Sequence, residues 1–458
     1  NQIILDGWSL AVLVQELATL YNGGGVDRLP PAPSYAEYIE RQLTYRQSAD
    51  ASRDRAFWKD TLAGELPVLA LPQARARAAM QTYGATSLSF RLSRARAEAL
   101  RQAARKAGAT PFMLLFAAHA IALRRFTGQD DLIIGTPVAV REGESDASLA
   151  GYATNLLPVR CRLDGRMSGI DCVKAVRRQL LDAFGHQRYP FGDVLEDIRI
   201  DRDPSRPPLV GTTFTLDRPL ADPGFSGARA TLLPLPFAFV PFDLTLSAIE
   251  DAGDLIFYCI YNRDLLEESV ARDFLDHYDR LLDALVATPD ARISRLVSLG
   301  PAEEQRMLVE WNRTAIDHGP ERNVVEVIER VLARNPDAIV AEEVVEAGGR
   351  KPWQLSARAL GRQSRRVALG LRAAGAEADA PIVLLAKRDL PFWVTMLGIL
   401  RAGAAYLPID PDLPAQRIAQ VIEESGAAIV ITRPEHAGVF AEADMLRDGG
   451  PALTRIFE

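Results

Sequence analysis

Side chains that could bind a metal or transfer a proton are thinly spread along this chain of 458 residues. The five histidines lie too far apart to form a metal-ligand motif: His119, His186, His277, His318 and His436. His119 falls within an apolar helical stretch, where a hydrogen-bonded core histidine is the expected interpretation. The motifs of zinc proteases, α/β-hydrolases and P-loop nucleotide-binding proteins do not occur. The sequence therefore predicts no metal site.

The carboxylate of Asp6 lies where it could cap a helix. Asp6 interrupts an apolar run, and after Gly7 apolar residues recur at helical spacing as far as Tyr21. Glycines at 23–25 then end this stretch. Asp is common at the start of a helix, because its side chain accepts a hydrogen bond from an unpaired backbone N–H group. On the residues alone, Asp6 could simply cap this helix.

Charge and composition exclude several function classes. The chain has 53 Lys and Arg against 60 Asp and Glu, a net charge of −7, so it lacks the basic field that nucleic-acid binding needs. No apolar run approaches the roughly 20 residues of a membrane span, and the N-terminus has no signal-peptide pattern. The three cysteines are scattered and form no CxxC pair: Cys161, Cys172 and Cys259. Buried reduced thiols in a cytoplasmic protein are the expected interpretation.

The elements that would position these residues fall into regions of different rhythm. Residues 1–85 contain the first helix, a proline-rich break and a polar helical stretch, and 73–85 look like a linker. In residues 86–298, strands and helices follow one another in a mixed α/β pattern. The expected strands begin at Thr86 and continue with 133–138, 153–160, 212–216, 244–248 and 255–261.

A turn-rich stretch, 299–322, separates this region from one with a stricter rhythm. In residues 323–458, strand and helix alternate over 382–386, 390–402, 404–409, 414–425 and 427–432. Such alternation indicates right-handed crossovers onto a parallel sheet, so the fold class is α/β. The length predicts two or three domains. Because the chain starts at Asn1 and enters an apolar run at once, we expect a fragment cut within a domain.

Short stretches in a fixed order resemble the signatures of condensation domains in nonribosomal peptide synthetases. Residues 2–9 (QIILDGWS) are similar to the HHxxxDGWS signature of that family. The later signatures are matched in order by 134–141 (IGTPVAVR), 151–160 (GYATNLLPVR), 186–191 (HQRYPF) and 202–206 (RDPSR). Residues 400–411 (LRAGAAYLPIDP) resemble the LKAGGAYVPLDP motif of adenylation domains, also called AMP-binding domains. The resemblance covers nearly the whole chain.

The resemblance implies a fold and a reaction. Condensation domains resemble chloramphenicol acetyltransferase, with two similar lobes and the active site in a tunnel between them. They join two substrates held as thioesters on carrier domains, because the α-amine of the acceptor attacks the thioester carbonyl of the donor. By position, residues 1–85 correspond to the end of the first lobe and the inter-lobe segment, 86–298 to the second lobe, 299–322 to a linker and 323–458 to the front of an adenylation domain.

The resemblance also implies partners and cofactors. The partners are carrier domains upstream and downstream and the remaining modules of the same synthetase. The cofactors are phosphopantetheine on the carrier domains and, for a complete adenylation domain alone, ATP and Mg²⁺. Most of the first lobe would precede Asn1, and the loop for the ATP phosphates would follow Glu458. This fragment is therefore expected to bind neither ATP nor Mg²⁺ and to be inactive alone.

The resemblance assigns roles to the first residues of the chain. In this family the second histidine of the signature positions the acceptor amine or takes its proton. The two histidines align with Asn1 and Gln2, and an amide cannot take up a proton near pH 7. Gln2 could still position the amine through its carbonyl oxygen. The signature aspartate, here Asp6 before Gly7, is mainly structural and bridges to an arginine, which by position is Arg141.

Three further features have two interpretations each. Trp8 is either a tunnel-wall residue or a core anchor, with the core favoured. Asn155 is either a polar group bonded to backbone or a contact to the pantetheine arm. The charged residues Arg202, Asp203 and Arg206 form either a surface ion-pair network or a carrier-docking patch.

Two rival functions stay open. Gln2 could mark a condensation-like scaffold that docks carrier domains without catalysis. An epimerisation domain of the same fold would invert an α-carbon instead of forming an amide. The adenylation start at 323–458 argues against epimerisation, because condensation domains are the usual upstream neighbours.

Overall fold

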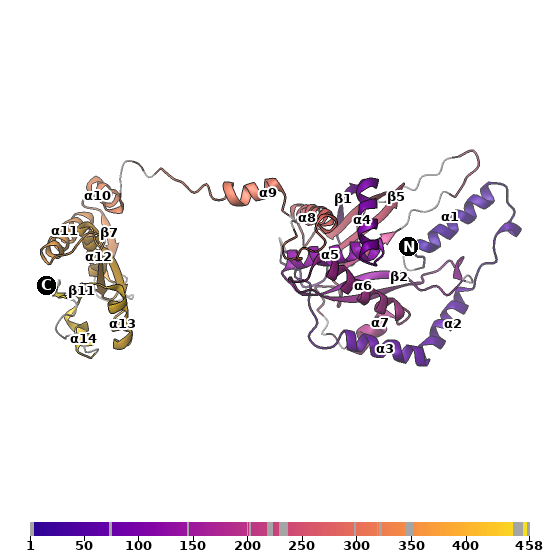
Figure 1. The fold of residues 1–458 in the computed structure, drawn as a ribbon, viewed down its shortest axis with the longest axis horizontal. Coiled ribbons are helices and arrows are strands. Elements are labelled where there is room, and N and C mark those ends of the chain that lie inside the picture. Colours follow the sequence, from indigo (N-terminus) through magenta and orange to yellow (C-terminus); the bar gives the residue numbers. More distant parts are fainter. Residues whose placement is uncertain are drawn as a thin grey trace. The chain divides into compact units, whose positions relative to one another are not determined.

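The computed structural model divides into two compact units, residues 1–313 and 314–458, each with its own sheets (Figure 1). The structure describes residues 4–72, 76–143, 146–198, 200, 203–217, 223–228, 237–296, 299–317, 319, 323–343, 352–442 and 452–455. Asn1, Gln2, Arg202 and His318 lie outside the described residues.

A six-stranded mixed sheet forms the centre of the first unit, with strand order β1-β6-β5-β4-β2-β3. Its strands are β1 (Ala85–Leu92), β2 (Asp131–Ala139), β3 (Thr154–Arg162), β4 (Thr212–Asp217), β5 (Leu244–Asp251) and β6 (Asp254–Asn262). The β2–β4 and β4–β5 pairs are parallel, and the other pairs are antiparallel. Ala252 and Gly253, both with positive φ, form the tight turn between β5 and β6. All six strands coincide with strands predicted from the sequence.

Long helices pack on this sheet and build the main core with it (Figure 1). They are α4 (Arg94–Lys106), α5 (Pro111–Thr127), α6 (Gly169–Gly185) and α8 (Glu268–Ala287). Phe214, Leu246 and Cys259 are neighbours in the strand register, and each is fully buried in this core. The side chain of Thr110 caps α5, and Gly128 ends that helix in the left-handed conformation.

Shorter helices flank the sheet. They are α1 (Gly7–Tyr21), η1 (Val26–Arg28), α2 (Tyr35–Arg46), α3 (Ala49–Thr61) and α7 (Phe191–Ile198). An ion pair between Arg55 and Asp197 joins α3 to α7. Residues 76–84, within the predicted linker, have no helix or strand, but the buried ion pair of Arg77 with Asp243 holds them to the start of β5.

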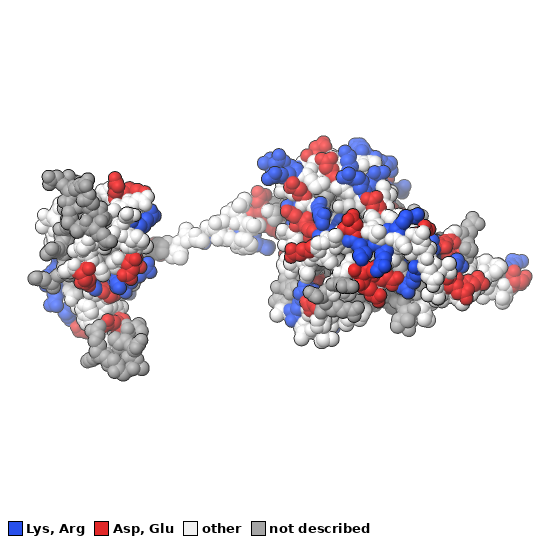
Figure 2. Space-filling view, turned by 90° about the horizontal axis from the view of Figure 1, so that it is seen from below, with Lys and Arg blue, Asp and Glu red and all other residues white. Residues whose placement is uncertain are grey.

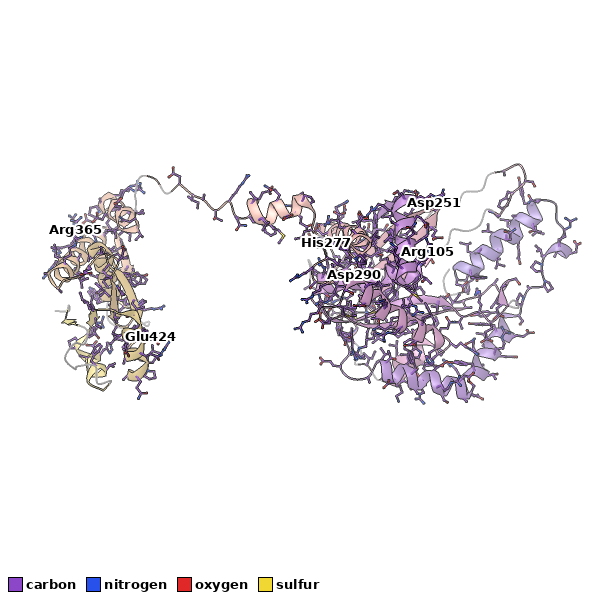
Figure 3. All side chains as sticks on the ribbon, in the orientation of Figure 1. Arg105, Asp251, His277, Asp290, Arg365 and Glu424 are labelled. Carbon is purple, nitrogen blue, oxygen red and sulfur yellow. The ribbon has the colours of Figure 1, made fainter. Side chains whose placement is uncertain are left out.

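Two short helical turns occur where the sequence predicted only a turn-rich linker. They are α9 (Pro301–Gln305) and η3 (Arg306–Glu310). The carboxylate of Glu303 contacts His277 Nε2 at 3.0 Å and Arg280 Nη2 at 3.1 Å, both on α8; His277 is labelled in Figure 3. This contact with α8 adds to two local start signals, Pro301 in the first turn and Glu303, whose carboxylate accepts from the Gly300 N–H at 3.4 Å.

The second unit contains a four-stranded parallel sheet in the order β10-β9-β11-β12, as the strict alternation predicted. Its strands are β9 (Pro381–Leu385), β10 (Ala405–Ile409), β11 (Ile429–Thr432) and β12 (Ala452–Arg455), beside a separate pair, β7 (Ile339–Glu342) and β8 (Gln354–Ser356). Its helices are α10 (Val324–Arg334), α11 (Ala357–Ala373), α12 (Leu390–Ala402), α13 (Ala415–Ser425), η4 (Pro434–His436) and α14 (Gly438–Glu442). Gly403 and Gly426 end α12 and α13 in the left-handed conformation.

Charged side chains of both signs are interspersed on the face of the first unit seen in Figure 2. Among the described helices, none alone is long and apolar enough to cross a membrane. Within the described part of the chain, α4 and α5 taken together pass that test, and they are bent by 95° relative to each other.

Candidate active site

Asp6 caps α1, as the residues alone allowed. Its backbone is extended, and its Oδ1 accepts hydrogen bonds from the Ser9 backbone N–H at 2.8 Å and from the Ser9 hydroxyl at 2.7 Å. This arrangement satisfies one of the free N–H groups in the first turn of the helix.

The same carboxylate forms the ion pair that the family resemblance implied. Arg141 Nη2 lies 2.9 Å from Asp6 Oδ1, and each side chain is only 6% exposed. Arg141 lies two residues after the end of β2, so the pair joins the start of α1 to the edge of that strand. The expected bridge is therefore confirmed, and it coexists with the helix cap instead of replacing it.

The second carboxylate oxygen of Asp6 is also occupied. Asp6 Oδ2 accepts hydrogen bonds from Ala153 N–H at 3.0 Å and from the Thr154 hydroxyl at 3.3 Å. Burial raises the pKa of Asp6, but hydrogen bonds from Ser9 and Ala153 and the charge of Arg141 outweigh it and hold that pKa below its ordinary value. Asp6 is thus a fully engaged anion, suited to holding structure and unsuited to taking a proton at neutral pH.

The connection between β2 and β3, described at residues 140–143 and 146–153, is bound to α1 through Ser9. The fully buried Ser9 hydroxyl accepts a hydrogen bond from Gly151 N–H at 3.0 Å and lies 2.8 Å from the Gly151 carbonyl oxygen. Arg141 Nη2 lies within 3.5 Å of the carbonyl oxygens of Leu149 and Gly151. The connection is therefore attached to α1 by both a hydroxyl and a guanidinium group.

Helix α2 packs against the other side of the same connection. The Tyr35 hydroxyl donates to the Tyr152 carbonyl oxygen at 2.8 Å. Tyr38 is buried in a small apolar cluster with Leu149 and Ala153. Arg41 Nη2 lies 2.5 Å from Asp146 Oδ1, whose side chain is 1% exposed. The candidate site, defined here as Asp6, Ser9, Arg141 and the β2–β3 connection, is thus supported by α1 and α2 together.

The core-anchor interpretation of Trp8 was wrong for this chain. Trp8 is 51% exposed, its Nε1 donates to the Ala147 carbonyl oxygen at 2.8 Å, and the Arg141 guanidinium lies 5.6 Å from its ring centre. The ring therefore covers one face of the buried cation and leaves much of its own surface to solvent.

The side-chain amide of Asn155 forms hydrogen bonds with backbone groups through both its nitrogen and its oxygen. Its Nδ2 donates to the carbonyl oxygens of Gln187 and Tyr189, both at 2.8 Å, and its Oδ1 accepts from Phe191 N–H at 3.0 Å. These bonds favour the structural alternative, in which Asn155 fixes the turn between α6 and α7. Gly7 occupies the first helical position of α1, and a Cβ added there would meet no atom within 4 Å.

The histidines take separate places. His119 is fully buried in the core as predicted; burial lowers its pKa to about 3, and its Nε2 lies 3.3 Å from the Thr212 hydroxyl. His186 Nδ1 contacts Asp54 Oδ1 at 2.7 Å, and its ring stacks on Phe57. Within the described ranges, no group of three or more His, Cys, Asp or Glu side chains is placed to hold a metal ion.

The three cysteines are buried, whereas the described part of the charged cluster at 202–206 lies at the surface. All three cysteines are free and buried, as predicted, and burial raises the pKa of Cys172 and of Cys259 to about 12. Of the charged cluster at 202–206, Asp203 and Arg206 form a surface ion pair at 2.7 Å.

Comparison with known proteins agrees with this geometry. A family model described as a condensation domain matches residues 3–308, and one described as an AMP-binding enzyme matches residues 328–455. The chain belongs to the condensation-domain family. The fold is a chloramphenicol-acetyltransferase-like condensation lobe followed by the start of a parallel-sheet AMP-binding domain, as predicted.

Its curated relatives are large synthetases. The chain is 31% identical to surfactin synthase subunit 1 of Bacillus subtilis (strain 168), over 97% of this chain and 12% of the relative. It is also 31% identical to tyrocidine synthase 3 of Brevibacillus parabrevis, over 96% of this chain and 7% of the relative. The chain thus spans about a tenth of the length of these relatives.

Solved structures share the fold. A four-domain nonribosomal peptide synthetase bound to AMP and glycine matches with a TM-score of 0.78 and 23% identity, over 99% of this chain and 34% of that one. The condensation domain of the Monacolin K polyketide synthase matches with a TM-score of 0.58 and 23% identity, over 63% of this chain and 69% of that one.

Proposed function

We propose that this chain is part of a nonribosomal peptide synthetase and contributes to a condensation site that forms an amide between two thioester-bound substrates. Residues 1–85 are the end of the first lobe and the inter-lobe segment, 86–298 the second lobe, 299–322 the linker and 323–458 the front of an adenylation domain. The buried Asp6–Arg141 pair carries the proposal, because it fixes the start of α1, directly after the signature position, onto the sheet.

The proposed reaction balances without any redox partner. The acceptor amine nitrogen forms a bond to the donor carbonyl carbon, and the bond from that carbon to the donor sulfur breaks. The amine loses one proton and the departing thiolate gains one. The substrates arrive on the phosphopantetheine arms of carrier domains upstream and downstream, which are the proposed partners with the other modules of the synthetase. The proposal places the protein in the cytoplasm, where buried thiols stay reduced.

The roles of the site residues follow from their contacts. Asp6 is ionised and its oxygens are engaged, so it positions α1 and takes no part in proton transfer. Gln2 stands at the position of the catalytic histidine and can accept a hydrogen bond from the amine but cannot hold its proton. We propose that the amine therefore reacts largely in its free-base form, which is accessible because an α-amine titrates near about 7.7–8.0.

ATP does not fit the described part of the second unit. At the carboxyl ends of β9 and β10, Lys387 and Arg388 share a cavity of about 310 Å³ with the carboxylates of Asp410 and Asp412. Lys387 lies 3.5 Å from Asp412, so part of its charge is already neutralised. A triphosphate needs converging backbone N–H groups and cations, and the described residues supply no glycine-rich loop there. Amino-acid activation is therefore assigned no step in this chain.

The test is amide formation by the full-length protein with donor and acceptor carriers loaded with thioester substrates. The product on the acceptor carrier is measured by intact-protein mass spectrometry. Asp6→Asn, which keeps the side-chain shape but removes the charge opposite Arg141, should lower the yield per minute about 10- to 100-fold. Glu268→Gln, at an exposed ion pair with Arg272 on α8, should leave it unchanged. Equal yields from the wild type and Asp6→Asn would contradict the proposal.

The scaffold function is the second candidate, because Gln2 replaces the histidine that the family uses. Under that alternative both carriers bind, yet no amide forms in the wild type or in Gln2→His.

A further inference from the structure

Gly151 is the point at which α1 and α2 both meet the β2–β3 connection. On one side, its N–H donates to the Ser9 hydroxyl at 3.0 Å. On the other side lies the ring of Tyr35, so that a Cβ added at position 151 would be 2.3 Å from Tyr35 Cδ2 and 2.4 Å from Tyr35 Cε2. A single glycine therefore sets the spacing between the two helices across the candidate site.

This contact, and not backbone conformation, demands glycine at position 151. Glycine is the usual residue where φ is positive, but Gly151 is not among the residues of this chain with positive φ. Any side chain could adopt its backbone angles. The three atoms nearest to a Cβ added there all belong to the ring of Tyr35, and two of them are too close for any real Cβ.

The ring of Tyr35 is held in place. Its hydroxyl donates to the Tyr152 carbonyl oxygen at 2.8 Å, and its ring stacks on that of Tyr38 at 5.6 Å between ring centres. Tyr38 is only 6% exposed and packs on Leu149. Moving the Tyr35 ring aside would therefore break a hydrogen bond and a ring contact, so strain at this point passes to the backbone of the connection.

The backbone on either side of Gly151 holds the two charged groups of the site. Ala153 N–H donates to Asp6, and the carbonyl oxygen of Leu149 accepts from Arg141. Bringing an added Cβ to an ordinary contact distance requires a shift of roughly 1 Å, enough to lengthen these hydrogen bonds beyond their normal range.

We propose that Tyr35 is a positioning residue for the condensation reaction: its ring, seated on Gly151, sets the β2–β3 connection against Asp6 and Arg141. This inference rests on the proposed function for its kinetic consequence, but its structural part does not. Tyr35 touches no reacting atom in this scheme; it acts through Gly151 on the groups that orient the start of α1.

The structural part is tested by hydrogen exchange of this chain, followed by mass spectrometry on peptides covering residues 5–12 and 147–156. Gly151→Ala should speed exchange in both peptides about tenfold or more, because Ser9, Gly151 and Ala153 lose their acceptors or donors. Tyr35→Ala should also speed exchange in the 147–156 peptide, because the ring that contacts Gly151 is removed. Tyr35→Phe, which keeps the ring, should speed it much less. Gly192→Ala, where a Cβ meets nothing within 4 Å, is the matched control and should change neither peptide.

The kinetic part is tested in the full-length protein with both loaded carriers. Gly151→Ala and Tyr35→Ala should each lower kcat about 10- to 100-fold with KM for each carrier unchanged, and Tyr35→Phe, which keeps the ring, should retain most of the rate. Unchanged exchange in Gly151→Ala, or wild-type exchange and kcat in Tyr35→Ala, would overturn the positioning role. If exchange responds as expected while the wild type forms no amide, the contact is upheld and the proposed function fails.

Discussion

Removal of the Asp6 carboxylate should destabilise the first unit by more than the loss of a helix cap. A cap alone is worth about 1 kcal/mol. Breaking a buried ion pair typically costs about 3–5 kcal/mol, because the remaining charge is left without its partner. In Asp6→Ala, Arg141 still has carbonyl acceptors and the ring of Trp8 beside it. The free-energy cost of leaving Arg141 without its carboxylate partner should therefore lie at the lower end of this range. Asp6→Ala should therefore cost about 3–5 kcal/mol in all.

Removal of the Arg141 charge should destabilise the first unit by less than removal of the Asp6 carboxylate. In Arg141→Met the Asp6 carboxylate keeps hydrogen bonds from Ser9 and Ala153, so we expect a loss of about 2–3 kcal/mol. The double variant should cost at least about 1 kcal/mol less than the sum of the single variants, because both remove one shared interaction.

The assay is urea unfolding of this chain, with the transition of the first unit followed by fluorescence of the buried Trp58. The free energy of unfolding is compared at constant m-value, so that a change in stability is separated from a change in the unfolded state. Asp203→Ala, at a surface ion pair, should leave the midpoint unchanged. A loss of about 1 kcal/mol or less in the free energy of unfolding of Asp6→Ala would show that Asp6 acts only as a helix cap. Strict additivity in the double variant would show that Asp6 and Arg141 share no stabilising interaction. Either result would refute the expected role of the ion pair.

The remaining predictions concern catalysis, activation and pH. Gln2→His should raise the condensation rate by roughly 10²-fold. The gain should be larger near about pH 6 than near about pH 8.5, where more of the amine is already in its free-base form. Equal rates for the wild type and Gln2→His at every pH would show that Gln2 already positions the amine adequately. This chain should catalyse no amino-acid-dependent pyrophosphate exchange, and measurable exchange would contradict the interpretation of its second unit. Because the pKa of Asp6 is lowered in the folded state, its stabilisation is complete above the unfolded value of about 3.9 and declines as the pH falls through the folded pKa; acid unfolding of Asp6→Ala should therefore depend less on pH in that range.

Much of the fold was accessible from the sequence, because the strands carry strong alternation and the helices carry clear caps. The strands of the first sheet and the parallel sheet of the second unit were both predicted. The helical turn at 301–305 was not predicted, because the turn-rich composition of 299–322 outweighed its local start signals, Pro301 and Glu303. The contact of Glu303 with His277, which adds to its stability, has no signal in the local sequence.

The sequence predicted only part of the candidate site. Asp6 and Arg141 were paired from the family resemblance, and no periodicity or spacing connects residues 135 positions apart. The contact of Tyr35 with Gly151 was missed, because Tyr35 lies outside the matched signatures and a glycine without positive φ gives no sign of what it packs against. Trp8 was misplaced because an aromatic residue at a helix start usually indicates a core contact, whereas here its ring lies beside the guanidinium of Arg141.

The central claim is that Asp6 and Arg141 hold a site that forms amide bonds. Its most direct test is the single-turnover rate of amide formation with both loaded carriers saturating, measured for the wild type and Asp6→Asn beside the dissociation constant of each carrier. We expect product from the wild type, a rate about 10- to 100-fold lower for Asp6→Asn and unchanged dissociation constants. Tight binding of both carriers with no amide formed by the wild type would contradict it.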